Sequence, residues 1–143
     1  MPDIEIRLLG AGDDAIVERA GNLFDKPPIP AATAAFLAAP DHNLFIAFVG
    51  GEPAGFVSGV EMIHPDKGTE MFLYELGVDE AFRGRGIGAA LVEALVAHAR
   101  ERGNYGMWAL TDHDNEAAIA TYRRAGASDS SDNLLLEWRF TDG

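Results

Sequence analysis

The sequence predicts an α/β (α+β) domain in which helices cover both faces of a mixed sheet. Apolar runs of strand length alternate with segments of helical periodicity, and their order joins hairpins to one strand–helix–strand crossover. The length of 143 residues fits a single domain spanning residues 1–143. Hydrophobic residues make up 48% and charged residues 24%, which is ordinary for a globular chain.

The first half of the chain predicts a strand, two helices and a hairpin. In chain order these are residues 4–9, 14–24, 31–38 and two strands within 43–63. The first segment alternates apolar and polar side chains at strand period. Asp13 or Asp14 can cap the first helix, and prolines between positions 27 and 30 separate it from the second. Gly50 and Gly51 supply the tight turn of the hairpin.

The second half predicts three strands and two helices. In chain order these are strand 70–78, helix 86–102, strand 105–110, helix 115–125 and a last strand at 133–140. Residues 70–78 are apolar on both faces, as expected for a central strand. The long helix has apolar side chains at helical spacing and stops at Gly103, which suits a helix C-terminus. The following helix stops in the same way before Gly126.

Charge and cysteine content exclude several classes of chemistry. The chain has no cysteine, so disulfides, thiolate metal sites and a cysteine acyl-enzyme are excluded. The net charge of -12 argues against a nucleic-acid surface and favours either a cationic partner or simple solubility. His42, His64 and His98 are too scattered to indicate a metal site. No apolar run approaches the roughly 18 residues of a membrane span, so we expect a cytoplasmic location without a membrane partner.

Residues 83–88 read RGRGIG and join strand 70–78 to the long helix. A helix N-terminus offers unpaired N–H groups and a partial positive charge, and glycine lets an anion approach the backbone closely. Arg83 and Arg85 add positive charge at the same place. The pattern favours a phosphate or pyrophosphate cradle. The alternative is a glycine-rich turn whose arginines are solvated.

The same loop formally satisfies a dinucleotide-binding fingerprint. Gly84, Gly86 and Ala89 match G-x-G-x-x-G/A. However, several residues separate the preceding strand from the first glycine, and one crossover is less than the two βαβαβ halves that a dinucleotide fold needs. A phosphate-binding P-loop is excluded because no Gly-Lys-Ser/Thr is present.

The loop resembles the acyl-CoA cradle of the GNAT N-acyltransferases. That family's Arg/Gln-x-x-Gly-x-Gly/Ala signature is matched by Arg83, Gly86 and Gly88. Its Asn-x-x-Ala-x-x-x-Tyr feature in the next helix is matched by Asn115, Ala118 and Tyr122. The resemblance covers nearly the whole chain and implies a GNAT-type, mostly antiparallel sheet with a splayed central strand. It also implies acetyl-CoA as cofactor, coenzyme A as product and no metal.

Within that family, residues 72–95 are most similar to the aminoglycoside 3-N-acetyltransferases. Glu75 stands where that group usually has aspartate, and His113 stands where a tyrosine is common. The likeness implies a cationic aminoglycoside acceptor, acetylated at its 3-amino position, and a role in antibiotic resistance. The alternatives are an acetyltransferase for a peptide N-terminus, polyamine or small metabolite amine, and a non-catalytic acyl-CoA-binding domain. A homodimer is left open.

Acetyl transfer from a thioester to an amine needs a proton acceptor and a proton donor. Primary amines are mostly protonated at pH 7, so a carboxylate near the amine can remove the proton. Glu75 is the best candidate because it interrupts an apolar strand; the alternative is a structurally paired glutamate. Tyr122 occupies the family's position for the acid that protonates the leaving thiolate; the alternative is packing alone. Without cysteine, we expect direct attack in a ternary complex.

The resemblance also assigns residues to the cofactor and the acceptor. The backbone of Leu76 and Val78 would pair with the pantetheine arm, with Gly77 easing a bulge. The cradle would comprise Arg83, Gly84, Arg85, Gly86, Ile87, Gly88 and Ala89. Asn115 would bond pantetheine amides or cap its helix.

An acidic loop precedes the helix 115–125. Its carboxylates could hold a cationic acceptor together with Glu75, or could complement the helix dipole; they are Asp112, Asp114 and Glu116. His113 is either a second base or an exposed loop residue.

Overall fold

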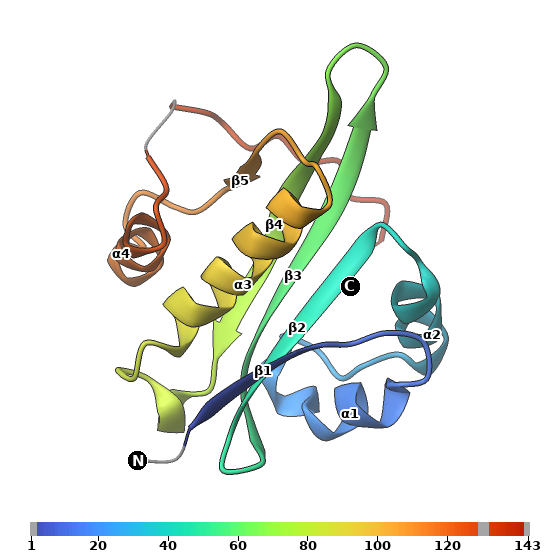
Figure 1. Cartoon of the computed structure of the whole chain (residues 1–143), viewed down its shortest axis with the longest axis vertical. Coiled ribbons are helices and arrows are strands. Elements are labelled where there is room, and N and C mark those ends of the chain that lie inside the picture. Colours follow the sequence, from blue (N-terminus) through green and yellow to red (C-terminus); the bar gives the residue numbers. More distant parts are fainter. Residues whose placement is uncertain (1–2, 129–131, 142–143) are drawn as a thin grey trace.

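Five strands of the described part of the chain form one sheet, and helices lie on both of its faces (Figure 1). The computed structural model describes residues 3–128 and 132–141. In chain order the elements are β1 (Ile4–Leu8), α1 (Asp14–Arg19), the 3-10 turn η1 (Gly21–Leu23), α2 (Pro30–Ala38), β2 (His42–Val49), β3 (Glu52–His64), β4 (Gly68–Val78), the 3-10 turn η2 (Glu80–Phe82), α3 (Ile87–Glu101), β5 (Met107–Ala109) and α4 (Glu116–Arg124). The strand order is β1-β2-β3-β4-β5, with β1 to β4 antiparallel and β5 parallel to β4. The expected mixed, mostly antiparallel sheet is confirmed.

Local sequence signals set most of the helix boundaries. Pro30 occupies the first turn of α2, where its missing N–H group breaks no helical hydrogen bond. Gly103 follows α3 with a φ of 78°, a left-handed conformation that glycine adopts without strain. The helix expected at 14–24 is shorter, because α1 ends at Arg19 and η1 follows. No helix in the described ranges is both long and apolar enough to cross a membrane.

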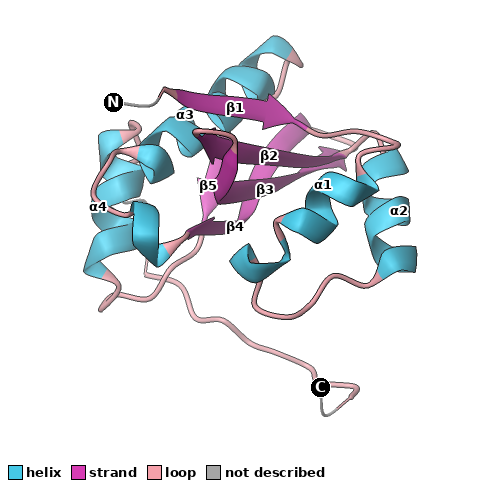
Figure 2. Cartoon of the chain, turned by 90° about the horizontal axis from the view of Figure 1, so that it is seen from below, coloured by secondary structure: helices cyan, strands magenta, loops and turns pink. Residues whose placement is uncertain are grey.

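Two apolar clusters hold the helices against the sheet. One lies under α3 and includes Leu91 and Leu95. The other lies under α1 and α2 and includes Val17, Leu37 and Phe56. Figure 2 shows α3 and α4 on one side of the strands and α1 and α2 on the other. Full burial of a Leu side chain stabilises a fold by about 1.5–3 kcal/mol, so these clusters fix the position of the helices.

A bulge at Tyr74 interrupts the pairing of β3 with β4. Ser58 pairs with Glu75 and Gly59 pairs with Leu73, so Tyr74 is the extra residue on β4. Successive strand residues normally point to opposite faces, and an extra residue shifts that alternation by one. The bulge expected at Gly77 is therefore three residues earlier. Gly77 instead provides room, since a Cβ atom there would lie 2.8 Å from Cε1 of Phe56.

The strand expected at 105–110 is present only as Met107–Ala109. It pairs with β4 through residues 71–73, and no further residue of β4 pairs with it. The two parallel strands thus separate after Leu73. This is the splayed central strand that the family resemblance implies.

The prediction of a last strand at 133–140 is wrong. In the described chain these residues form no strand and pair with none. The segment runs past the sheet and ends apart from the rest of the molecule (Figure 2). Its apolar side chains are between 71% and 91% exposed; they are Leu134, Leu135, Leu136, Trp138 and Phe140. The alternating pattern was suited to a strand, but a strand also needs a neighbour to pair with.

Candidate functional site

A cavity of about 650 Å³ lies between the α1–α2 layer and strands β3 and β4. Its walls are mostly apolar and include the phenylalanine rings of Phe24, Phe36, Phe56 and Phe72. Two carboxylates, Asp25 and Glu75, also line it. A cavity of this size accommodates a small organic molecule, and its few polar groups are the ones that can orient it.

The bulge at Tyr74 turns Glu75 into this cavity. Leu73 and Leu76 belong to the cluster under α3, whereas Tyr74 and Glu75 both line the cavity on the opposite face. Without the extra residue, strict alternation would place Glu75 on the same face as Leu73. Burial raises the pKa of the Glu75 carboxyl, and the nearby negative charge of Asp25 raises it further. Glu75 is therefore a better proton acceptor than an ordinary surface glutamate.

Ser58 is a polar group of the cavity that the sequence did not reveal. It pairs with Glu75 across the two strands and is 7% exposed. Its hydroxyl is buried without a hydrogen-bond partner among the described residues. Buried polar atoms usually have partners, and this one lines a cavity, so it is available to a bound molecule.

The separation of β4 from β5 leaves backbone groups of β4 without a strand partner. Leu76 and Val78 lie in this stretch, as expected for residues that pair with a pantetheine arm. Arg83 donates from Nε to the carbonyl oxygen of Val78 at 3.2 Å. That hydrogen bond ties the start of the glycine-rich loop to the end of β4.

The glycine-rich loop leaves the backbone at the start of α3 uncovered. Gly84 and Gly86 have φ values of 80° and 79°, and Gly86 directly precedes α3. A Cβ atom at either position would meet no atom of residues 3–128 or 132–141 within 4 Å, so the space over this backbone is open. The N–H groups at the start of a helix have no intrahelical partners and attract anions. In α3 these include the N–H groups of Ile87 and Ala89. The Arg85 guanidinium lies over the Phe82 ring, 5.4 Å from its centroid.

Three elements that carry expected cofactor residues meet at Gly88. A Cβ atom there would lie 3.2 Å from Cγ2 of Thr121 on α4 and 3.7 Å from Cγ2 of Val78 on β4. The next residue of α4, Tyr122, packs against the cluster under α3. Burial raises the pKa of its phenol, which keeps it protonated at neutral pH. Tyr122 and Glu75 thus lie on opposite faces of the sheet, beside the stretch of β4 that β5 does not cover.

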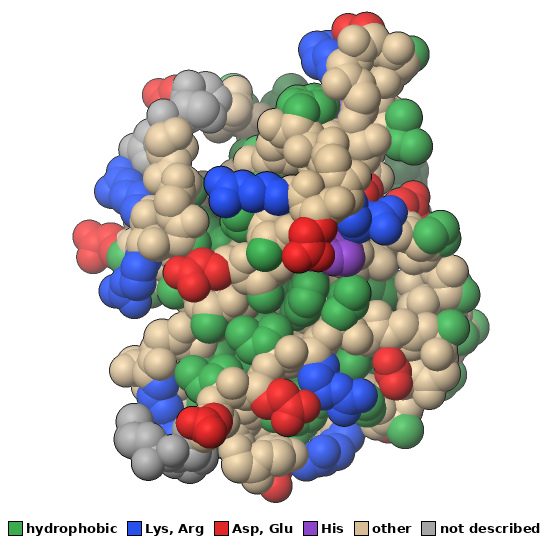
Figure 3. Space-filling model, in the orientation of Figure 1, with side chains coloured by type: hydrophobic (Ala, Val, Ile, Leu, Met, Phe, Trp, Pro, Cys, Tyr) green, Lys and Arg blue, Asp and Glu red, His purple; other side chains and the backbone are tan. Residues whose placement is uncertain are grey.

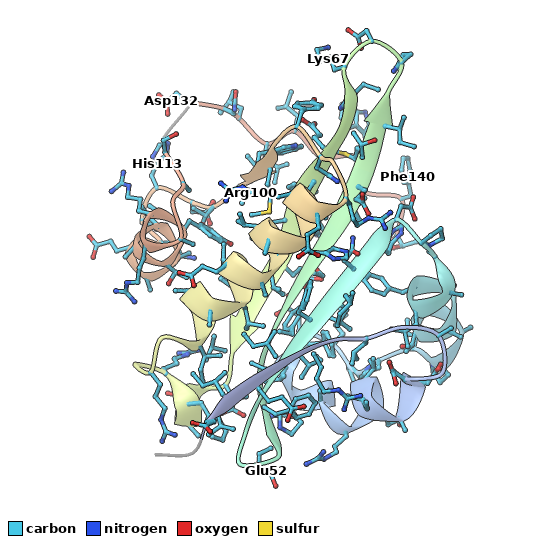
Figure 4. The ribbon with its side chains drawn as sticks, in the orientation of Figure 1. Glu52, Lys67, Arg100, His113, Asp132 and Phe140 are labelled. Atoms are coloured by element: carbon cyan, nitrogen blue, oxygen red, sulfur yellow. The ribbon has the colours of Figure 1, made fainter. Side chains whose placement is uncertain are left out.

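The acidic loop is not part of the cavity. Asp112, Asp114 and Glu116 are exposed and none lines it. His113 is an exposed loop residue whose Nε2 lies 3.0 Å from Oδ1 of Asp132 (Figure 4). Asn115 is the cap of α4, because its Oδ1 accepts a hydrogen bond from the Ala118 N–H at 3.1 Å.

The negative charge of the chain is not gathered on the α3 face. Figure 3 shows acidic and basic side chains scattered around this face, with apolar side chains in its middle. The overall charge of -12 therefore gives no acceptor-binding patch on this side. Among the charged side chains that line the cavity, Asp25 and Glu75 are acidic and Lys26 is basic.

Comparisons with known proteins agree with this arrangement. Residues 14–127 match the acetyltransferase (GNAT) family. A mycothiol acetyltransferase from Nocardia farcinica is 34% identical over 79% of this chain and 33% of its own length. The N-alpha-acetyltransferase RimI of Mycobacterium tuberculosis is 35% identical over 71% of this chain and 62% of its own. The chain therefore spans about one third of the length of the first of these curated relatives and about three fifths of the length of the second.

The fold has close counterparts among solved structures. An aminoglycoside acetyltransferase, meta-AAC0020 from an uncultured soil metagenomic sample, superimposes with a TM-score of 0.88 over 96% of this chain and 97% of its own. The identity is 17%, so this likeness concerns the fold. Because the family match covers most of the sequence and the motif residues meet around one splayed strand, the chain belongs to the acetyltransferase (GNAT) family.

Proposed function

We propose that the chain is an acetyl-CoA-dependent N-acetyltransferase that transfers the acetyl group directly to a primary amine in a ternary complex. The observation that carries this proposal is the bulge at Tyr74. It directs Glu75 into an apolar cavity beside the uncovered stretch of β4. Acetyl transfer to an amine requires a base close to a held thioester, and in this proposal the open edge of β4 holds the thioester donor.

Glu75 is the general base. An amine that enters the cavity as an ammonium ion is attracted by Glu75 and Asp25, and it must lose a proton before it can attack. A carboxyl with a raised pKa takes that proton more readily than an ordinary one. The apolar walls lower the local polarity, which strengthens the attraction between the carboxylates and the ammonium.

The cofactor binds on the side of β4 opposite the cavity, along the stretch that β5 does not cover. When bound, acetyl-CoA supplies an activated acetyl group as a thioester. The backbone of Leu76 and Val78 holds the pantetheine arm, and the loop 83–89 holds the pyrophosphate. Asn115 uses Oδ1 to cap α4, so its amide N–H groups are the donors left for a pantetheine carbonyl. Tyr122 donates its phenolic proton to the departing sulfur.

An aminoglycoside is the leading acceptor, with its 3-amino group as the site of acetylation and antibiotic resistance as the biological role. The cavity holds two carboxylates, which suit a polyamine sugar, and the solved structures with this fold include aminoglycoside acetyltransferases. In this proposal Asp112, Asp114 and Glu116 contact the parts of a polycation that extend beyond the cavity. They are exposed and free to do so.

A smaller amine with an apolar body is the second candidate, and the cavity walls favour it. Four phenylalanine rings, Pro27 and Pro28 surround the two carboxylates. Such walls gain more from an apolar body than from the hydroxyl groups of a sugar, which would lose water and find few partners. The related acetyltransferases include one named for an N-alpha amine.

One assay separates these proposals. Coenzyme A release from acetyl-CoA is measured with gentamicin-type aminoglycosides, polyamines, peptides with a free N-terminus and phenyl-substituted alkylamines. Turnover with aminoglycosides alone supports the leading acceptor, and turnover with phenyl-substituted amines supports the second. Binding of acetyl-CoA without turnover on any amine would contradict the enzymatic proposal and identify an acyl-CoA-binding domain.

A further inference from the structure

His42 lines the cavity, and the proposed chemistry does not use it. It belongs to β2, whereas Glu75, which lines the same cavity, belongs to β4. Nδ1 of His42 lies 2.9 Å from Oδ1 of Asp41. The ring also meets the Phe36 ring edge-on, with centroids 5.3 Å apart and planes at 71°. A hydrogen bond and an aromatic contact therefore hold the imidazole in one orientation.

Asp41 determines which ring nitrogen of His42 is available to a bound molecule. The hydrogen bond from His42 is the main cause that lowers the pKa of the Asp41 carboxyl, so this carboxyl is ionised at neutral pH and can only accept. In the neutral ring the proton therefore lies on Nδ1, and Nε2 is an acceptor. Nε2 has no hydrogen-bond partner among residues 3–128 and 132–141. A molecule that lies against this ring meets an acceptor suited to a hydroxyl group.

Strand register places His42 and Glu75 at opposite corners of the cavity floor. Two neighbouring rows of residues cross β2, β3 and β4 and line the cavity; they are Leu44, Ser58 and Glu75 in one row and His42, Val60 and Phe72 in the next. Neighbouring strands lie about 4.8 Å apart, and two residues along a strand rise about 6.8 Å. The two corners are therefore about 12 Å apart at the backbone. Apart from Ser58, the side chains of these rows between the two corners are apolar.

We propose that His42 is a second acceptor-binding residue, and that the acceptor carries a hydroxyl group at the end opposite its primary amine. The amine lies at Glu75, the hydroxyl donates to Nε2 of His42, and an apolar body fills the space between them. Two hydrogen bonds of about 2.9 Å leave roughly 6–8 Å between the amine nitrogen and the hydroxyl oxygen. A phenyl ring with a two-carbon amine arm and a hydroxyl on the opposite ring carbon has this length. The inference rests on the proposed acetyltransferase function and specifies the smaller of its two acceptor candidates.

The availability of Nε2 makes the cavity selective among end groups of similar size. A hydrogen atom or a methoxy group at that end of the acceptor would cover Nε2 without giving it a donor. A buried acceptor that loses water and gains no partner weakens binding. A hydroxyl group avoids this loss, so the preference for it should depend on His42.

Ratios of kcat/KM for three amines test this contact. The amines are phenethylamine, para-hydroxyphenethylamine and para-methoxyphenethylamine, and the measurement is coenzyme A release from acetyl-CoA. With the unaltered protein, the hydroxylated amine should exceed each of the others by roughly 3- to 10-fold. His42→Phe keeps a ring beside Phe36 and removes the acceptor, so the ratio should fall to about one or less.

His64→Phe is the matched control for this variant. His64 is also a strand histidine beside a carboxylate, with Nε2 3.1 Å from Oε1 of Glu70, but it does not line the cavity. The control should keep the preference of the unaltered protein. Each ratio compares two substrates on one enzyme, so a general loss of folded protein does not change it.

Three results would overturn the role of His42. They are equal kcat/KM for the hydroxylated and unsubstituted amines, a methoxy amine as good as the hydroxylated one, and a preference that His42→Phe leaves unchanged. Failure of the proposed function gives a different result, because no amine would then release coenzyme A. In that case the same amines are titrated calorimetrically into protein saturated with coenzyme A. Tighter binding of the hydroxylated amine that His42→Phe abolishes supports the contact, and equal affinities overturn it.

Discussion

Ser58 and Glu75 pair across β3 and β4, and both side chains line the same cavity. Their pairing depends on the extra residue at Tyr74, which turns Glu75 away from the cluster under α3. The site therefore presents a buried hydroxyl and a carboxylate of raised pKa side by side to a bound molecule. The roles of the carboxylate and of the hydroxyl can therefore be tested separately.

Replacing the base should remove turnover but leave cofactor binding intact. Glu75→Gln keeps the shape of the side chain and cannot accept a proton from an ammonium ion. We expect kcat to fall by roughly 10²–10⁴-fold, with the KM for acetyl-CoA nearly unchanged, in steady-state assays of coenzyme A release. Glu52→Gln, at the tip of the β2–β3 hairpin, is the control and should behave as the unaltered protein (Figure 4). Equal activity of the two variants would contradict the role of Glu75.

The pH dependence should report the raised pKa of Glu75. A base is active when deprotonated, so kcat/KM should fall as the pH decreases through a pKa above the ordinary value of 4.5. Removing the negative charge of Asp25 lowers that pKa, because this charge is one of its causes. Asp25→Asn should therefore shift the acid limb of the pH–rate profile to lower pH. An acid limb that stays at the same pH would show that the charge of Asp25 does not influence the pKa of Glu75.

The same shift has a consequence for stability. A glutamate whose folded pKa is raised binds its proton more tightly in the folded state, so it destabilises the fold once the pH exceeds the unfolded pKa. Glu75→Gln removes that penalty. We expect a higher Tm than the unaltered protein at pH 7, and a smaller difference as the pH falls toward the unfolded pKa, both measured by calorimetry. A lower Tm at pH 7 would show that Glu75 has a stabilising partner.

The loop that precedes α3 should control cofactor affinity. Gly86→Ala places a side chain on a backbone with a φ of 79°, which costs about 1–2 kcal/mol and reshapes the open cradle. We expect the KM for acetyl-CoA to rise at least tenfold, since the N–H groups move from their positions. Gly103→Ala imposes the same backbone strain at the other end of α3, where φ is 78°, and should leave this KM unchanged. A similar KM for both variants would refute the cradle.

Much of the site could be predicted because its residues are specified by local sequence. The glycine loop, the cap at Asn115 and the helix α3 depend on neighbours in the chain, and the structure has them where expected. The bulge at Tyr74 could not be predicted, since it depends on the register between two strands and no glycine or proline marks it. The cavity was missed for the same reason.

The prediction of a last strand failed in the opposite way, because the sequence indicated an element that the structure does not contain in these residues. Residues 133–140 have the alternation of a strand, but pairing requires a neighbour that the sequence of the segment does not specify. The acidic loop likewise has suitable charges, yet its position relative to the cavity is decided by where β5 ends.

Tyr122→Phe should distinguish proton donation from packing. The phenylalanine keeps the contacts with the cluster under α3 and removes only the hydroxyl. If Tyr122 protonates the sulfur, kcat should fall by roughly 10²-fold or more while the dissociation constant of acetyl-CoA, measured by calorimetric titration, stays the same. A weaker affinity with an unchanged kcat would assign Tyr122 to packing alone.

Ser58→Ala should show whether the Ser58 hydroxyl contributes to acceptor binding or to the stability of the fold. The buried hydroxyl has no partner among the described residues, and leaving such a group without a hydrogen bond costs about 1–3 kcal/mol. Removing it should therefore leave the free energy of unfolding unchanged or raise it, as measured by urea denaturation. The variant should also bind the amine acceptor less well, because the acceptor loses a hydrogen bond next to Glu75, so its KM should rise while that of acetyl-CoA does not. A loss of stability without any effect on the acceptor would mean that the hydroxyl serves the fold, and would remove Ser58 from the site.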